Sequence, residues 1–321
     1  MKKRYYILAR VIGFLLIALA SSVFVLQIPS VQTQMAREVF RLLGRNLDAD
    51  IRVGSIQIVP GNGLLIQDLL VIDSNPYTED IYNRGWSRVD TVVSVSSIKA
   101  RFSLRGILGG KPFKIRSVQV DDGLFALTSE PGGEGSSNLQ RIFKLQPSGK
   151  KPGPESVFQI NKAHISGFRF RLVNFGPKKK ETPEIGFDWD NLDVRVNLKA
   201  SDIHYTDGRM HGICDRLDAV AAGGYRIRRA GGSAVVGRGR TLLTDLHLED
   251  DFSNLRFEHL TLNYADTKAF SNFPQEVSID GEFEPTVFNF RSLQYFSGKK
   301  SANASEFEIE RGLVSGPVSH L

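Results

Sequence analysis

The sequence predicts a mostly β protein in which an N-terminal transmembrane helix precedes an elongated, twisted antiparallel sheet that forms an open groove, with a few short covering helices. Two observations predict this fold: an uncharged apolar stretch near the N-terminus, and repeated alternation of apolar and polar residues from residue 50 onward. Strong helical periodicity is scarce in that second part. Antiparallel sheets with one covered face alternate in this way, whereas amphipathic helices repeat every 3.6 residues.

Composition limits the function classes. A chain of 321 residues with 41% hydrophobic residues can bury a sizeable core. The net charge of +6 comes from basic residues that are spread among acidic ones, which does not favour nucleic acid as a partner. Cys214 is the single cysteine, so no intramolecular disulfide can form.

Residues 1–28 are predicted to form a cytoplasmic basic tip and a transmembrane anchor. Lys2, Lys3 and Arg4 lie before an uncharged stretch, Val11 to Ile28, whose length as a helix is about 27 Å, close to the thickness of a bilayer core. The predicted anchor residues are Val11, Phe14, Leu15, Leu16, Leu19, Val23, Phe24 and Leu26. This predicts a single-pass protein of the cell inner membrane, with the bulk of the chain in the periplasm of a bacterium with two membranes.

A cleaved signal peptide is the alternative for this stretch. Ala18, Leu19 and Ala20 form a small-residue box after the basic start, as at a cleavage site. The apolar run continues through Val23 to Leu26, beyond that box, which favours an anchor that is not cleaved.

Residues 29–45 are predicted to form an amphipathic helix. Val31, Met35 and Val39 recur at helical spacing between Pro29 and Gly44, which are typical start and stop signals. The helix either covers one end of the sheet or lies on the membrane surface.

The rest of the chain divides into two predicted β-groove segments, 46–145 and 157–296, with a Pro/Gly/Lys-rich linker at 146–156 and an irregular end at 297–321. In the first segment, separate strands are expected from Lys114 and from Gly123, with a glycine-containing turn between them, and residues 163–172 have the same pattern around Gly167. A short covering helix is expected at 137–145.

The alternation defines one apolar face. In residues 168–172, for example, Phe168 and Phe170 face one way while Arg169 and Arg171 face the other. The predicted lining of the groove is Ile56, Ile58, Val118, Val120, Phe168, Phe170, Val194 and Val196. The same face could instead be a closed core, and the sequence leaves both open.

Catalytic chemistry is not predicted. His204, Asp207, His211 and Cys214 are the densest set of potential metal ligands, but their spacing matches no standard site. Asp188, Asp190 and Asp193 have no catalytic partner nearby and are expected to be surface residues. We therefore expect no enzyme, no metal and no cofactor.

Several pieces of the chain, in order, carry a resemblance to a known family: residues 48–74, residues 102–127 followed by 137–143, residues 241–264 and residues 288–296. Together with the anchor, they make the chain similar to the AsmA-like family, specifically to the N-terminal region of its translocation and assembly module TamB branch. Members of that branch are generally several times longer. The resemblance covers most of residues 5–296.

The resemblance implies an inner-membrane-anchored periplasmic protein with a long β-groove that has an apolar interior. It implies a role in outer-membrane biogenesis, through carriage of phospholipid, or through assembly or secretion of outer-membrane proteins with an outer-membrane β-barrel partner. The alternative function is a chaperone-like scaffold that binds β-rich clients by strand augmentation, without lipid transport.

Overall fold

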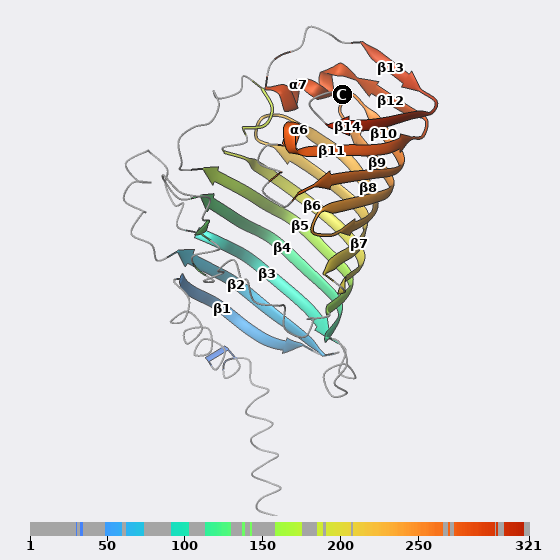
Figure 1. Cartoon of the computed structure of the whole chain (residues 1–321). Coiled ribbons are helices and arrows are strands. Elements are labelled where there is room, and N and C mark those ends of the chain that lie inside the picture. Colours follow the sequence, from blue (N-terminus) through green and yellow to red (C-terminus); the bar gives the residue numbers. More distant parts are fainter. Residues whose placement is uncertain are drawn as a thin grey trace, which may run out of the picture.

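The computed structural model describes residues 30, 33–34, 49–59, 62–73, 91–102, 113–129, 137–138, 142, 158–174, 185–188, 191–206, 208–265, 269, 273–298, 300 and 305–317. These residues form one open, twisted sheet of 14 strands, with the short helices α6 (Phe273–Glu276) and α7 (Phe290–Ser297) at its C-terminal end. Figure 1 shows the sheet twisting from β1 in blue to the C-terminal strands in red. The predicted mostly β fold with few helices is confirmed for this part of the chain.

The strands, in chain order, are β1 (Ala49–Val59), β2 (Gly63–Asp73), β3 (Thr91–Phe102), β4 (Phe113–Ser129), β5 (Phe158–Asn174), β6 (Asp193–Thr206), β7 (Arg209–Ala221), β8 (Arg226–Val236), β9 (Arg240–Asp250), β10 (Asn254–Tyr264), β11 (Val277–Phe283), β12 (Thr286–Asn289), β13 (Glu306–Ile309) and β14 (Gly312–Pro317). Strands β1 to β11 lie side by side in sequence order, followed by β14. The predicted segments 46–145 and 157–296 therefore contribute to the same sheet.

One pair of neighbouring strands departs from the predicted antiparallel arrangement. β4 and β5 are parallel, while the other strand pairs of the described sheet are antiparallel. A parallel pair needs a long connection that returns the chain to the starting edge, and residues 130–157 supply it. The expected linker at 146–156 lies between β4 and β5 in the sequence, outside the described residues.

The expected turns at Gly123 and near Gly167 are wrong. β4 and β5 each continue through these positions as a single strand of 17 residues. Asp122 has φ +50° and Gly167 has φ +62°, so each strand contains one residue in the left-handed region. A single such residue displaces a strand without reversing it, and the residues on both sides keep their partners in the neighbouring strands.

The irregular end expected at 297–321 is also wrong. β13 pairs with β12, and β14 pairs with β11 from Phe283 and Gly312 to Ser278 and Pro317. β14 alternates between half-buried and exposed residues over only six residues, and glycines stand at two of them, so its pattern is hard to detect in the sequence.

The two predicted covering helices are described only at single positions. Residues 30, 33 and 34 are helical, and the Thr33 hydroxyl bonds both the N–H and the carbonyl of Ile56, at 3.1 Å each, on the edge strand β1. Asn138 and Ile142 are helical, and the Asn138 side chain accepts from the N–H of Thr128 and donates to the carbonyl of Ala126. Both segments therefore contact strands, as expected for covering segments.

The structure does not describe the predicted anchor. Its residues, 11–28, and the basic tip before them lie outside the described part of the chain. Within the described part, no helix has the length and apolar character needed to span a bilayer.

Among the described residues, buried hydrophobic side chains form clusters near both ends of the sheet. At the N-terminal end, Ala49, Val92 and Ile142 pack together. Towards the C-terminal end, Tyr264 and Val277 form a second cluster with a neighbouring alanine. In the described part of the chain, therefore, no second sheet covers the broad middle of the first.

Candidate functional site

The apolar residues of β1 to β6 are aligned across the sheet in four rows. Directly opposed residues in neighbouring strands share a face, so the strand register determines these rows. From β1 to β6, the rows are Ile58, Leu64, Ala100, Val118, Ala163 and Ala200; Ile56, Ile66, Ile98, Val120, Ile165 and Leu198; Val53, Leu69, Val95, Gly123, Phe168 and Val196; and Ile51, Val71, Val93, Phe125, Phe170 and Val194. We call this surface the apolar face, and the opposite surface of the same strands the polar face.

All eight residues predicted to line a groove lie on the apolar face. Ile58 and Val118 belong to the first row and Ile56 and Val120 to the second. The third row contains Phe168 and Val196, which are directly opposed, and the fourth contains Phe170 and Val194. Sequence alternation thus identified residues on four strands, β1, β4, β5 and β6, that share one surface of the sheet.

The exposure of these side chains distinguishes an open face from a closed core. Ile56 is buried at 8% exposure, Ile58 is 67% exposed, and the other six are half-buried. In a closed core, a second layer would bury Phe168 and Phe170 fully, but both are half-buried. The Phe170 ring stacks on the Phe125 ring of the neighbouring strand, with 5.8 Å between centroids. The apolar face is therefore only partly covered.

Each of β1 to β5 interrupts its alternation at the same place. In regular alternation, one polar residue separates two apolar-face residues. Here two small or polar residues separate them, so the next apolar-face residue follows three positions after the last one instead of two. We call this the polar line; its pairs are Gly54-Ser55, Gln67-Asp68, Ser96-Ser97, Asp121-Asp122 and Ser166-Gly167. Because all five strands make the same step, they stay in register with each other.

Side-chain hydrogen bonds connect the polar line from strand to strand. The Ser166 hydroxyl donates to Asp121 at 2.6 Å, and the Gly167 N–H donates to the Asn197 side chain at 2.7 Å. Asn197 in turn donates to Asp218 on β7 at 2.7 Å. β6 lacks the extra residue, so the register shifts between β5 and β6 at this point.

On the polar face, arginines next to the polar line are held in ion pairs. Arg169 donates two hydrogen bonds to Asp193, at 2.7 and 2.5 Å, and Arg171 lies 3.7 Å from the same carboxylate. The hydrogen bond from Arg169 lowers the pKa of Asp193 below its ordinary value. Asp193, expected to be a surface residue, is therefore part of a structural ion pair.

Basic residues also cluster at a second place on the polar face. The sequence alone had suggested that the basic residues are scattered. Lys99, Arg101, Lys162 and Lys199, from β3, β5 and β6, line one shallow hollow of about 550 Å³. The signal was present in the alternation, since these residues stand at polar-face positions. Their neighbourhood depended on the pairing of β4 with β5, which the sequence did not reveal.

Among the residues that the structure describes, the histidines and the cysteine considered as metal ligands do not come together in a group of three or more potential ligands. His204 and His211 are opposed on β6 and β7, and their rings stack at 4.7 Å with 3° between the planes. Asp207 lies outside the described residues. Cys214 is opposite Ala200, and burial, with a smaller effect of Asp215, raises the pKa of its thiol. A protonated, half-buried thiol is a poor nucleophile and a poor metal ligand.

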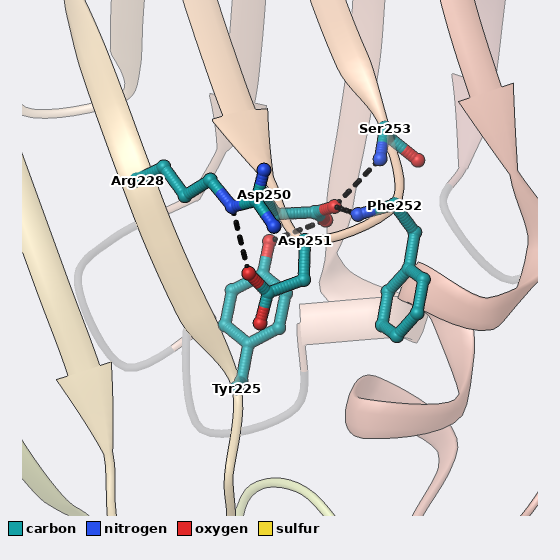
Figure 2. Close-up of polar contacts among 6 residues, drawn as sticks. All are labelled: Tyr225, Arg228, Asp250, Asp251, Phe252 and Ser253. Carbon is teal, nitrogen blue, oxygen red and sulfur yellow. Dashed lines mark hydrogen bonds and ion pairs between the residues drawn. The ribbon is translucent and has the colours of Figure 1, made fainter.

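A polar network fixes the C-terminal helix to the sheet. Asp250, at the end of β9 and 3% exposed, accepts from the Tyr225 hydroxyl at 3.1 Å and from the N–H groups of Phe252 and Ser253, at 2.7 Å each. Figure 2 shows these three bonds converging on one carboxylate, beside the exposed pair of Arg228 and its partner. The Ser253 hydroxyl then accepts from the N–H of Asn289, the N-cap of α7.

Tyr225 makes this network sensitive to high pH. Burial and the neighbouring Asp250 carboxylate raise the pKa of Tyr225 above its ordinary value of 10.0. Unfolded Tyr225 therefore loses its proton first, and the stability it contributes is complete below pH 10 and lost as the pH rises towards the folded pKa. We expect Tyr225→Phe to cost about 1 kcal/mol near neutral pH.

The difference in unfolding free energy between wild type and Tyr225→Phe should shrink above pH 10, as measured by urea titration at a series of pH values. A difference that stays constant through that range would contradict the assigned role of the hydroxyl.

Comparison with protein-family models, with characterised proteins and with solved structures gives no match for this chain. The candidate site is thus defined by the geometry of the sheet: a half-covered apolar face on one side and a charged polar face on the other.

Proposed function

We propose that the apolar face holds the acyl chains of a lipid, as part of an inner-membrane-anchored periplasmic protein that serves outer-membrane biogenesis. The observation that carries this proposal is the four continuous apolar rows across six strands, whose aromatic members are only half-buried. With strands about 4.8 Å apart and a rise of about 3.3 Å per residue over the seven residues from the first row to the fourth, the rows extend over about 24 by 23 Å. Apolar surfaces of that size on a folded protein commonly mark a binding site.

The energetics favour lipid as the occupant. Each methylene group moved from water to this surface contributes about 0.8 kcal/mol, so a single chain gains several kcal/mol from partial burial. The apolar face is chemically uniform. Its rows contain no charged side chain, so an acyl chain lying along them meets no ionised group. A headgroup can stay in water at the rim.

The location rests on the N-terminal sequence and on the resemblance to the AsmA-like family. The basic residues before residue 11 support an anchor with the sheet on the periplasmic side. The resemblance to the TamB branch suggests the wider role. This role is carriage of phospholipid or support of outer-membrane protein assembly with a β-barrel partner, and the proposal includes both.

The test compares two valine-to-aspartate variants on neighbouring strands. Val196→Asp places a carboxylate on the apolar face, whereas Val220→Asp places it on the polar face, where Val220 is 49% exposed and opposed to Arg195 and Arg226. The full chain, expressed in the envelope of a bacterium with two membranes and extracted in mild detergent, is analysed by native mass spectrometry and lipid extraction. Any lipid bound by the N-terminal stretch is present in both variants, so it does not affect the difference in lipid content between them.

We expect wild type and Val220→Asp to retain phospholipid that Val196→Asp has lost, with unchanged β circular dichroism. If Val196→Asp unfolds, the isosteric Val196→Thr is the second variant and should lose part of the lipid. Equal lipid in all the folded variants would overturn the proposal.

Strand augmentation is the second candidate, and one observation favours it. β14 pairs with β11 on one side, and Leu313 on β14 is 81% exposed. An exposed edge with a large apolar side chain is a typical docking place for an added strand. A lipid-free, folded wild-type protein in the experiment above would favour this scaffold function over lipid binding.

A further inference from the structure

We propose that the basic hollow on the polar face binds a phosphate-bearing anion. This hollow of about 550 Å³ is lined by Lys99, Arg101, Ser117, Val118, Gln119, Lys162, Ala163, His164, Lys199, Ala200, Ser201 and Asp215. The inference does not depend on the proposed lipid function, because it concerns the opposite face of the sheet.

Strand register gathers the charges. Lys99, Gln119, His164 and Lys199 are opposed in turn from β3 to β6, so they form one row on the polar face. The ends of this row are about 14 Å apart, given about 4.8 Å between strands. A second row, two residues along each strand, contains Arg101 and Ser117 as one opposed pair. Lys162 and Ser201 form another opposed pair in this second row. Three of the five strands that line the hollow, β3, β5 and β6, contribute these four cations.

The floor of the hollow is backbone. Val118, Ala163 and Ala200 stand between the two polar rows, and since side chains alternate between faces, theirs point to the apolar face. The two serines of the second row, Ser117 and Ser201, have short side chains. Long cationic side chains around a floor of backbone and hydroxyl groups leave room for a ligand of headgroup size.

The four cations have no acidic partner within the described part of the chain. Other arginines do: Arg169 pairs with Asp193, Arg228 with Asp251, and Arg311 with Glu282. The one acidic residue of the hollow, Asp215, accepts a hydrogen bond from the Ser201 hydroxyl at 2.9 Å. A second carboxylate, Asp121, borders the hollow and accepts a hydrogen bond from the Gln119 side chain at 2.8 Å. Four positive side chains against these two carboxylates still leave an excess of positive charge, and like charges on neighbouring strands repel. A bound anion would remove that repulsion.

Phosphate chemistry fits this arrangement better than a carboxylate does. A phosphate group presents several acceptor oxygens, which suit the point charges of lysines approaching from different strands and the fork of one arginine. Two sources share this chemistry, a free phosphate and the phosphodiester of a lipid headgroup. The experiment below distinguishes them.

The test uses the full chain in mild detergent, titrated by calorimetry with inorganic phosphate and, separately, with a soluble short-chain phosphatidylglycerol. The variant K99Q/K162Q/K199Q removes three exposed charges from the hollow. The matched control R226Q/R229Q/R238Q removes three exposed arginine charges elsewhere, so the net charge is the same. We expect binding to be weakened about tenfold or more by the first variant and about twofold or less by the control.

A third variant tests the sign of the effect. Asp215→Asn removes the one negative charge of the hollow while its amide oxygen can still accept from Ser201. We expect it to tighten binding by a few-fold, and added salt to weaken binding in every protein. Response to both probes would identify phosphate itself as the ligand group, and response to the lipid alone would identify the headgroup. No binding of either probe, or equal losses in the two triple variants, would overturn the proposal.

Discussion

Replacing Asp250 by alanine is expected to lower the free energy of unfolding by about 3–5 kcal/mol, because it leaves three donors without their acceptor in a buried place. These donors are the Tyr225 hydroxyl and the N–H groups of Phe252 and Ser253. Asp250 is 3% exposed, and Ser253 is also 3% exposed, so water cannot readily replace the carboxylate. Urea denaturation followed by circular dichroism measures the change.

Asp251→Ala is the matched control for this prediction. Asp251 is the next residue, also an aspartate, and it pairs with Arg228 at 2.8 Å. The side chains of Asp251 and Arg228 are 32% and 53% exposed, so the pair is well solvated and its loss should cost about 1 kcal/mol or less. Equal losses in the two variants would show that the buried network is not what fixes this end of the sheet.

The effect should be concentrated at the C-terminal end. Ser253 connects the turn after β9 to Asn289, the N-cap of α7, and its hydroxyl also lies 2.7 Å from that of Ser292 on the helix. Loosening the turn therefore releases the start of α7. Strands β7 and β8 lie between β6, the last strand of the apolar rows, and β9, which carries Asp250. The lipid measurement should therefore change little in Asp250→Ala if the protein remains folded.

Alternation made the apolar face predictable from the sequence. In residues such as Val194 and Val196, the period of two directly assigns a face, and no long-range information is needed. The hairpin from β1 to β2 followed from the same signal. Local patterns of this kind survive in the fold because each strand must bury the same side.

At the polar line, prediction of strands and turns from the alternation pattern failed. The pairs Asp121-Asp122 and Ser166-Gly167 look like turns, since aspartate and glycine favour the left-handed region. Whether such a residue turns the chain or only shifts it depends on whether its flanks find partners in other strands, which is a long-range property. The step of three residues, seen in one strand after another, was the available signal for a continuous sheet.

The pairing of strands that are not joined by a hairpin could not be predicted from the sequence. The parallel pairing of β4 with β5 follows from a crossover, not from any residue in either strand. That pairing in turn places Gln119 beside His164, and so creates the basic hollow. The network around Asp250 could not be predicted from the sequence either, because it joins residues from β9, from the turn after β9 and from the position before β8.

A junction of glycines next to α7 is a further product of tertiary contact. The Gly186 N–H donates to the Gly223 carbonyl at 3.1 Å, and the Phe187 N–H donates to the Tyr295 carbonyl at 2.9 Å. Around this backbone contact, the Tyr225 ring lies 5.3 Å from both the Phe187 and the Tyr295 rings, measured between centroids. Three segments far apart in the sequence thus meet through main-chain groups.

Gly186→Ala is expected to destabilise the protein by about 4 kcal/mol, the combined cost of a left-handed backbone and a clash with main chain that cannot move aside. Gly186 has φ +89°, and a Cβ there would lie 2.0 Å from the Tyr295 carbonyl oxygen. Gly208→Ala separates the two causes: Gly208 has φ +70°, but a Cβ there meets nothing within 4 Å, so the loss should be about 1 kcal/mol. Urea denaturation gives both values, and near-ultraviolet circular dichroism should show the aromatic cluster disturbed in Gly186→Ala alone. If the two alanines cost the same, backbone strain accounts for both, and the close approach of α7 to residue 186 is not needed for stability.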